Sequence, residues 1–268
     1  MMIRHIFLDM DNTLLDSHGE IKEKTAVFLR KIQIPVTLVS ARAPLEMDFA
    51  IRKLKLTGSQ VSFNGGLIFD PNSEGKDSVF AMPLEYTDVY AVLNKIGVNQ
   101  PGISISWYTR TGWYATKNDK GTQFESNLTG FQPTILKTLP TNSSKGDPIY
   151  KIMIICFAED KMQETEQKVN ELGLNGVCAR FSGKTYLEIT NANSIKSNAI
   201  AYIQSSRGLR RDELAAFGDG QNDIEMFKAV GTPIAMRNAS AAVKKHAKFV
   251  TSSNDQDGVM YGIKNYLL

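Results

Sequence analysis

Residues 4–15, RHIFLDMDNTLL, join a short apolar run to two acidic side chains, Asp9 and Asp11. The run at 6–8 predicts a buried β-strand, and charged groups are rare at the end of such a strand unless they are paired or bind a metal. In an open parallel sheet that end is where ligands bind. Two neighbouring carboxylates repel each other unless a cation lies between them, and their hard oxygens suit Mg²⁺. We therefore interpret Asp9 and Asp11 as the chemical centre; the alternative is a polar turn over residues 9–13 held by side-chain hydrogen bonds.

The composition is that of an ordinary globular protein. The chain has 268 residues, of which 42% are hydrophobic and 22% charged, enough for one large domain or two smaller ones. Its net charge of +3 is dispersed without a basic block, so we expect no nucleic-acid partner. Cys156 and Cys178 lack the Cys-Xaa-Xaa-Cys spacing, which argues against a zinc or redox site. With neither a signal-peptide pattern nor an apolar run of about 18 residues, we expect a cytoplasmic monomer or homodimer with no membrane partner.

The first part of the chain alternates between strands and helices. Strands are predicted at 6–8, 35–39 and 60–63, and amphipathic helices at 20–33 and from Pro44 onward. Crossover helices between short apolar strands indicate a parallel sheet with right-handed connections. Asn64-Gly65 permits a positive φ and a tight turn into the apolar residues 67–69.

The pattern changes from about residue 82. We predict helices at 86–96 and 160–172, the second with Asp160 as its N-cap, and strands at 103–108, 113–116, 150–157, 176–181 and 185–189. Alternation in 103–108 predicts antiparallel strands with one solvated face, and a polar tract runs on to residue 146. Four aromatic residues invite two interpretations, a stacking surface or cross-strand core packing, and we favour packing; they are Trp107, Tyr108, Trp113 and Tyr114.

After residue 189 the strand–helix alternation returns. Helices are predicted at 193–204, 224–229, 239–246 and 258–267, with strands at 213–217, 232–235 and 249–250. Three strands therefore end in polar clusters, which parallel pairing brings to one edge of the sheet; the clusters are Asp9/Asp11/Thr13, Ser40/Arg42 and Asp219/Asn222/Asp223. Lys196 lies near the start of the helix predicted at 193–204. It can be interpreted either as a solvated helix lysine or as a counter-charge to these carboxylates.

Two of these clusters resemble motifs of the haloacid dehalogenase (HAD) superfamily of phosphohydrolases. Residues 9–13, DMDNT, are similar to its first motif, Asp-Xaa-Asp-Xaa-Thr, and residues 218–223, GDGQND, to its fourth, Gly-Asp-Xaa-Xaa-Asn-Asp. Ser40 matches the second motif and Lys196 the third, so the resemblance runs in order along the whole chain. The chain departs from the family pattern at three positions where the family often has glycine. These are Ala41 in the second motif, Ser197 after the third-motif lysine, and Asn12 before the first-motif threonine.

The length and the inserted block resemble the Cof-type subgroup, which carries a large cap. The resemblance implies an α/β fold with a Rossmann-like parallel sheet in a catalytic core domain, residues 1–81 and 189–268. It also implies an inserted α+β cap domain, residues 82–188, that sets substrate specificity.

The same resemblance implies roles for individual residues. Asp9 attacks phosphorus and forms an aspartyl-phosphate, and Asp11 is the general acid and then the general base. Mg²⁺ is held by a side-chain oxygen of Asp9, the backbone carbonyl of Asp11 and the carboxylate of Asp219, while Asp223 orients a water on the metal. The phosphate-binding group implied is Met10, Ser40, the amide of Ala41, Lys196 and Asn222, with Lys196 also restraining Asp9. A divalent ion and a lysine would offset the repulsion between an anionic nucleophile and a phosphoryl group.

These expectations converge on a Mg²⁺-dependent phosphatase for small phosphorylated metabolites, with sugar phosphates as one candidate class. The alternatives are a phosphomutase or phosphotransferase on the same fold and a non-catalytic protein that binds phosphorylated metabolites. A sensor needs no nucleophile, so retention of Asp9, Asp11, Lys196, Asp219 and Asp223 favours an enzyme.

Overall fold

The computed structural model describes residues 2–72, 78–97, 99–140 and 147–268. The chain divides into two compact units, the first made of Met1–Arg42, Met47–Ala81 and Ile195–Leu268, and the second of Ala43–Glu46 and Met82–Ser194. The second unit runs beyond the boundary expected after residue 188, because β11 (Tyr186–Asn191) pairs with β10 (Val177–Phe181) as far as Asn191. The end of the polar tract predicted up to residue 146 lies outside the described residues.

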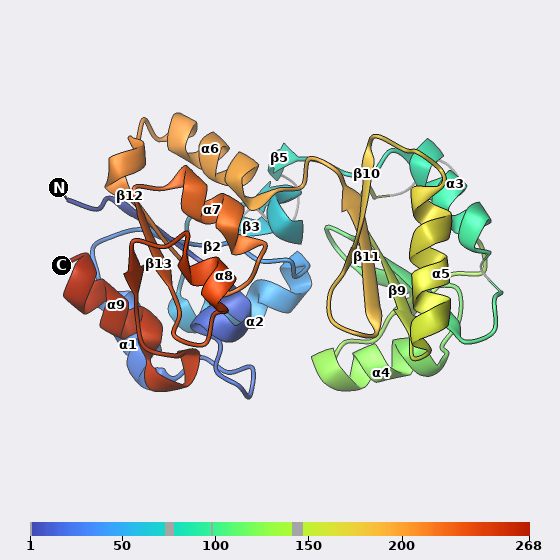
Figure 1. The fold of residues 1–268 in the computed structure, drawn as a ribbon, viewed down its shortest axis with the longest axis horizontal. Helices are drawn as coiled ribbons and strands as arrows, with labels where there is room; N and C mark the ends of the chain where they lie inside the picture. The colour runs from blue at the N-terminus through green and yellow to red at the C-terminus, as the bar shows by residue number, and fades with distance from the viewer. Residues whose placement is uncertain (1, 73–77, 98, 141–146) are drawn as a thin grey trace. The chain divides into compact units, whose positions relative to one another are not determined.

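A five-stranded parallel sheet forms the centre of the first unit (Figure 1). Its strands, in the order β14-β13-β12-β1-β2, are β14 (Phe249–Val250), β13 (Thr232–Ala235), β12 (Leu214–Gly218), β1 (His5–Leu8) and β2 (Val36–Leu38). Every residue of β1 is buried, and β1 pairs with β12 on one side and β2 on the other. The predicted parallel sheet is thus present, and the apolar run before Asp9 is one of its inner strands.

Helices cover both faces of this sheet. Alternate residues of β1 and β12, including Phe7 and Ala216, share a core cluster with Ile200 of α6 (Lys196–Ser206) and Phe227 of α7 (Asp223–Ala229). The opposite face carries Phe217, against whose ring Gly262 of α9 (Gly258–Tyr266) packs closely, and α1 (Glu23–Lys31) contacts α9. The first unit also contains α8 (Ala241–Lys244) and, from Met47 onward, α2 (Pro44–Leu54).

The third predicted strand is not part of the five-stranded sheet. β3 (Gln60–Ser62) pairs antiparallel with β4 (Leu67–Phe69), and β4 pairs with β5 (Ser78–Ala81), in a separate three-stranded sheet. A single parallel bridge between Val39 and Val61 connects β3 to the end of β2. The strand predicted at 60–63 is therefore present, but it meets the parallel sheet only at this bridge, and the predicted turn at Asn64-Gly65 pairs it with β4.

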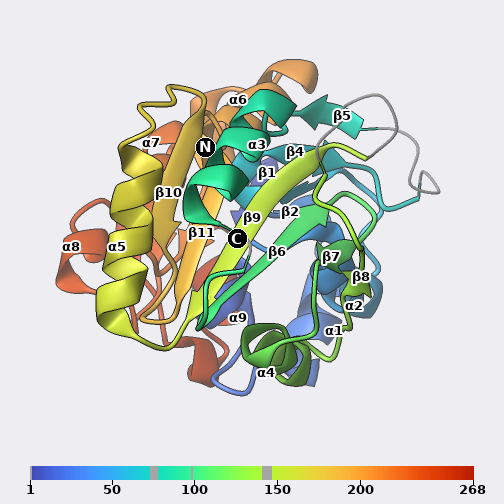
Figure 2. The ribbon, with the colours of Figure 1, turned by 90° about the vertical axis from the view of Figure 1, so that its right-hand side faces the viewer.

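A six-stranded sheet organises the second unit, and Figure 2 shows its long strands β9 and β6 with helices packed beside them. The order is β10-β11-β9-β6-β7-β8, with β6 (Ile103–Thr109), β7 (Trp113–Ala115), β8 (Thr134–Ile135) and β9 (Ile149–Cys156) completing the set. All pairings are antiparallel except β7 with β8. The helices α3 (Tyr86–Ile96) and α5 (Glu159–Asn170) share a core cluster with β6, β9 and β11.

Two features of the second unit differ from the sequence interpretation. β6 is buried along its whole length and has no solvated face, because α4 (Lys120–Thr129), which the polar sequence did not predict, packs against it. The N-cap of α5 is Ala158 without a side-chain hydrogen bond, and Asp160 lies in the first turn.

Cross-strand packing of the aromatic residues is confirmed. Tyr108 and Trp113 stack with ring centroids 5.7 Å apart, and Trp107 stacks on Tyr114 at 6.3 Å. Both tryptophans and Tyr108 are buried. Among the described residues, no helix has the length and apolar character needed to cross a lipid bilayer.

Candidate active site

The end of β1 places Asp9 between two neighbouring strands. The Asp9 N–H donates to the Phe217 carbonyl of β12 at 3.0 Å, and the carbonyl of the preceding Leu8 accepts from the Val39 N–H at 2.8 Å. The backbone is therefore held from both sides where the carboxylate leaves the sheet. Asp9 is 6% exposed, and a turn over Met10–Leu14 follows it, in which Asp11 and Asn12 have non-helical φ and ψ.

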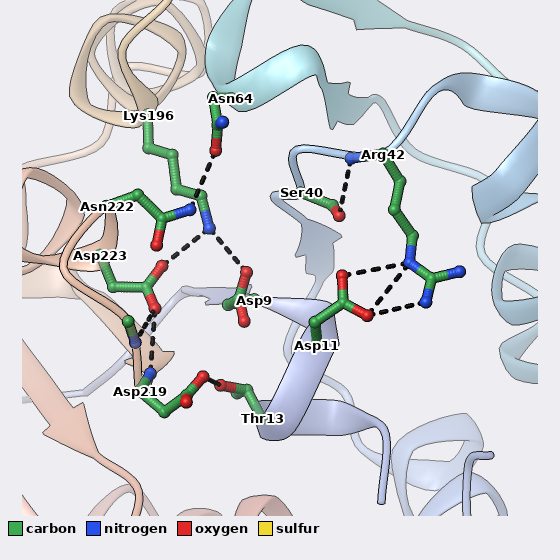
Figure 3. Close-up of polar contacts among 11 residues, drawn as sticks. Asp9, Asp11, Thr13, Ser40, Arg42, Asn64, Lys196, Asp219, Asn222 and Asp223 are labelled. Carbon is green, nitrogen blue, oxygen red and sulfur yellow. Dashed lines mark hydrogen bonds and ion pairs between the residues drawn. The ribbon is translucent and has the colours of Figure 1, made fainter. Parts of the chain in front are cut away.

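Lys196 connects two acidic side chains that come from different ends of the chain (Figure 3). Its Nζ donates to Asp9 Oδ1 at 2.6 Å and to Asp223 Oδ1 at 2.7 Å. Only 1% of the Lys196 side chain is exposed. The interpretation of Lys196 as a counter-charge is thus the one that the geometry supports, since a solvated lysine would lie at the surface.

Two glycines allow this close approach. A Cβ on Gly65, whose φ is +101°, would lie 2.4 Å from the Ile195 carbonyl oxygen, so the turn after β3 can touch the start of α6 only without a side chain. A Cβ on Gly218 would lie 2.4 Å from Cγ of Asp223. The glycine that ends β12 therefore leaves the volume that the Asp223 carboxyl group fills.

Asp223 is held at both of its oxygens. Oδ1 accepts from Lys196, and Oδ2 accepts from the backbone N–H groups of Asp219 and Gly220, each at 2.9 Å. Asp223 therefore ties the loop after β12 to Lys196. The neighbouring Asp219 accepts a hydrogen bond at Oδ1 from the Thr13 hydroxyl at 3.1 Å.

Burial, and after it repulsion between carboxylates, raises the pKa values of two carboxyl groups of the site. Burial, together with repulsion from Asp223, raises the pKa of Asp9 well above its usual value, although Lys196 opposes the change. The same two causes raise the pKa of Asp219 to about 6, against the opposing effects of Thr13 and Lys196. Burial lowers the pKa of Lys196, but attraction to Asp223 and Asp9 outweighs it and the net pKa is raised. The lysine therefore stays charged.

Asp9, Asp219 and Asp223 can supply a cation with oxygen ligands. One carboxylate oxygen from each lies within 4.8 Å of the others. When ionised, the three carboxylates carry two more negative charges than Lys196 offsets, and an all-oxygen donor set suits a hard divalent cation such as Mg²⁺. The donor set thus fits the predicted metal. The side chain of Asp11, the fourth residue predicted to hold it, lies outside this group, and a contribution from its backbone carbonyl stays a prediction.

The Asp11 carboxylate lies against Arg42 instead. Arg42 Nη2 donates to Asp11 Oδ1 at 2.7 Å, and Nε lies 3.2 and 3.1 Å from the two oxygens. This pair is half-exposed, with 50% of the Asp11 side chain accessible. The sequence places Arg42 only in the polar cluster after β2, and no sequence pattern indicates its ion pair with Asp11.

The predicted phosphate-binding residues lie around this centre. Ser40 is buried, and its hydroxyl accepts the Arg42 N–H at 3.2 Å, while no described residue accepts the hydrogen of this hydroxyl. The Met10 side chain is fully buried, so only its backbone can meet a ligand. Asn222 is exposed and donates from Nδ2 to Asn64 Oδ1 at 3.0 Å. Asn64, read from the sequence only as a turn residue, thus orients a predicted ligand-binding amide.

A family model described as haloacid dehalogenase-like hydrolase matches residues 6–263. The chain is a haloacid dehalogenase-like hydrolase. The predicted superfamily, the α/β fold with a parallel core sheet and additional sheets, and the enzyme class are confirmed.

Relatives and solved structures agree with the family over nearly the whole chain. A 5-amino-6-(5-phospho-D-ribitylamino)uracil phosphatase of Bacillus subtilis is 26% identical over 282 residues, covering 98% of this hydrolase and 97% of the relative. A phosphoglycolate phosphatase of Archaeoglobus fulgidus is 23% identical, with coverage of 97% and 95%. The structure of a haloacid dehalogenase-like hydrolase from Bacteroides thetaiotaomicron has a TM-score of 0.85 at 26% identity, with 98% of each chain covered.

Proposed function

We propose that this hydrolase is a Mg²⁺-dependent phosphatase that cleaves phosphate monoesters of small metabolites through an aspartyl-phosphate on Asp9. The observation that carries the proposal is the position of Asp9, which is buried at the end of an inner strand with Lys196 on one oxygen. Among the described residues, Oδ2 of Asp9 accepts no hydrogen bond and is free to attack phosphorus.

The first step breaks the ester P–O bond as Asp9 Oδ2 bonds to phosphorus. The leaving alkoxide needs a proton, and Asp11, two residues further along the same turn, is the group proposed to give it. A carboxyl group cannot keep both oxygens on Arg42 while it protonates an alcohol, so Asp11 must turn away from Arg42 in this step. In the second step Asp11 accepts a proton from the attacking water, and phosphate leaves Asp9.

The charges of the phosphoryl group are met by donors around the site. Lys196, the Ser40 hydroxyl, the Ala41 amide and the Asn222 amide are proposed to bind its oxygens, and Lys196 also keeps Asp9 in place. A divalent cation, when bound by Asp9 and Asp219, would supply positive charge at the phosphoryl oxygens. We propose Asp223 mainly as a positioning residue, because its oxygens are engaged by Lys196 and by two backbone amides.

The names of the relatives and the organisation of the chain support the proposed substrate class. The two named relatives act, by their names, on a phosphorylated ribitylamino-uracil and on phosphoglycolate, both small phosphate monoesters. We propose the second unit as the cap that selects among such esters, and sugar phosphates are the first class to screen.

Hydrolysis of p-nitrophenyl phosphate tests the proposal. We expect turnover with Mg²⁺, loss of turnover with EDTA and recovery on adding Mg²⁺ in excess. Asp9→Asn should lower turnover by at least about 10³-fold, because it removes the nucleophile. Asp48→Asn on the surface of α2 is the matched control and should leave turnover unchanged. Metal-independent hydrolysis, or full activity of Asp9→Asn with an unaltered circular dichroism spectrum, would contradict the proposal.

A further inference from the structure

A cavity lies entirely within the second unit, formed by the start of β6, the end of β9, the first turns of α4 and α5 and the segments beside them. Figure 2 shows these strand ends beside the helix starts. Its volume is about 380 Å³, which is within the range of small-molecule sites. None of its lining residues belongs to the constellation around Asp9.

The floor of the cavity is apolar. Ile103, Ile155, Ala158 and Pro101 contribute to it, and Phe157 stands at its side with 42% of its surface exposed. The Phe157 ring is fixed edge-on by Phe124, with centroids 5.3 Å apart. An exposed phenylalanine held in place beside an apolar floor is a suitable surface for a flat or compact apolar group.

The rim is positively charged. Three lysines line the cavity, Lys117, Lys120 and Lys161, together with a single acid, Asp119. Lys120 Nζ lies 4.7 Å from the centroid of the Phe157 ring, so the ammonium group and the ring face the same space.

Asp119 offsets the charge of one of the three lysines, through an ion pair in which its Oδ2 lies 3.9 Å from Lys117 Nζ. Its Oδ1 accepts the N–H groups of Gly121 and Thr122, each at 3.2 Å, and the Ser104 hydroxyl, as the N-cap of α4. Gly121 must be a glycine here, since a Cβ would lie 2.3 Å from the Ser104 Cβ. The other oxygen of this carboxylate is thus engaged in fixing the helix start on β6, and no ion pair with Lys120 or Lys161 is found among the described residues.

The lysines keep donors for a ligand. An ammonium group has three N–H donors, and in the described part of the chain Lys161 uses one of them on the Pro101 carbonyl at 3.2 Å. Lys120 makes the ring contact but no hydrogen bond with a described residue. We infer that this cavity binds a small molecule that joins an apolar body to two or more anionic groups, with the body on Phe157 and the anions on Lys120 and Lys161.

The test uses naphthalene-1,5-disulfonate, a flat disulfonate with no phosphate ester to hydrolyse, and the full chain with ¹³C-labelled isoleucine methyl groups. Ile103 and Ile155 report from the cavity floor, and we expect their signals to shift saturably at sub-millimolar probe. Inorganic sulfate alone and uncharged 1-naphthalenemethanol alone should each bind at least about tenfold more weakly, because each offers only half of the recognised chemistry.

Variants locate the charges. The double change Lys120→Gln and Lys161→Gln should weaken the disulfonate by about tenfold. Lys137→Gln, an exposed lysine of the same unit outside the cavity, is the matched control and should change affinity less than about twofold. Shifts absent from Ile103 and Ile155, equal affinity for sulfate alone, or an unaltered affinity in the double variant would each overturn the inference. The readout is binding, so it is independent of whether the proposed phosphatase activity is found.

Discussion

Replacing Lys196 by methionine tests the charge arrangement of the site. The substitution keeps a long apolar stem but removes the ammonium group that lies 2.6 Å from Asp9 and 2.7 Å from Asp223. Breaking a buried ion pair on one side typically costs about 3–5 kcal/mol, because an uncompensated charge stays buried. We expect the free energy of unfolding to fall by this amount at pH 8 in the absence of metal. In assays with Mg²⁺, turnover should fall by about 10²-fold or more.

The loss should depend on pH in a definite direction. Lys196 opposes the rise in the pKa of Asp9 caused by burial and by Asp223, so its removal raises that pKa further. An acid whose pKa is higher in the folded state than in the unfolded state binds its proton more tightly when folded, and stability then falls as pH rises between the two values. The cost of Lys196→Met should therefore be smaller at pH 5 than at pH 8.

Lys228→Met is the matched control. Lys228 makes an ion pair with Glu225 at the same 2.6 Å, but its side chain is 57% exposed, so the loss should be about 1 kcal/mol or less. Both tryptophans, Trp107 and Trp113, lie in the second unit, and hydrogen exchange of the β1 amides therefore reports the first unit better than fluorescence does. Equal losses for the two variants, or a Lys196→Met cost that does not shrink at pH 5, would refute this account.

Two further predictions concern buried groups of the first unit. Burial, followed by the charge of Arg207, lowers the pKa of His5 from 6.5 to about 3, so the unfolded chain takes up a proton that the folded chain does not, and stability falls as pH drops below 6.5. Between pH 6.5 and 5 the free energy of unfolding, measured by urea titration, should fall by about 2 kcal/mol more in the wild type than in His5→Gln. His18→Gln, a variant at an exposed histidine, is the control and should follow the wild type. The same pH dependence in His5→Gln and the wild type would contradict this prediction. Gly218→Ala should lower the free energy of unfolding by about 1–3 kcal/mol and reduce turnover, because its Cβ would lie 2.4 Å from Asp223 Cγ. Gly58→Ala is the control and should change neither quantity, because its Cβ would meet only the flexible end of Arg207. Similar activities for the two variants would argue against a tight fit at Gly218.

Local patterns predicted most elements because each rests on apolar periodicity. β1, β9 and the helix α3 have apolar runs or stripes that match their burial. α4 was missed because its sequence, KGTQFESNLT, has few apolar residues and depends on the Asp119–Thr122 capping box and on packing against β6. β3 was predicted as a strand, and the tight turn predicted at Asn64-Gly65 leads directly into its partner β4. The sequence pattern did not indicate that β3 would meet the parallel sheet at a single bridge.

The site was predictable only where its residues form motifs. Asp9, Asp219 and Asp223 lie together as the motifs implied, and Lys196 reaches them from a segment that follows the second unit. The contact between Arg42 and Asp11 joins residues 31 positions apart through side chains alone. No sequence periodicity predicts such a contact, because it depends on how the fold brings two loops together and not on the local conformation of either loop.

The position of β1 has a consequence for how the protein is made. Its partner β2 follows almost at once, but β12 comes only after the entire second unit, more than two hundred residues downstream of β1. During synthesis one side of this apolar strand therefore lacks its neighbour, and an open strand edge is prone to pair with other chains. A nascent chain halted before residue 214 should accordingly be a target for chaperones, even when its second unit has already folded.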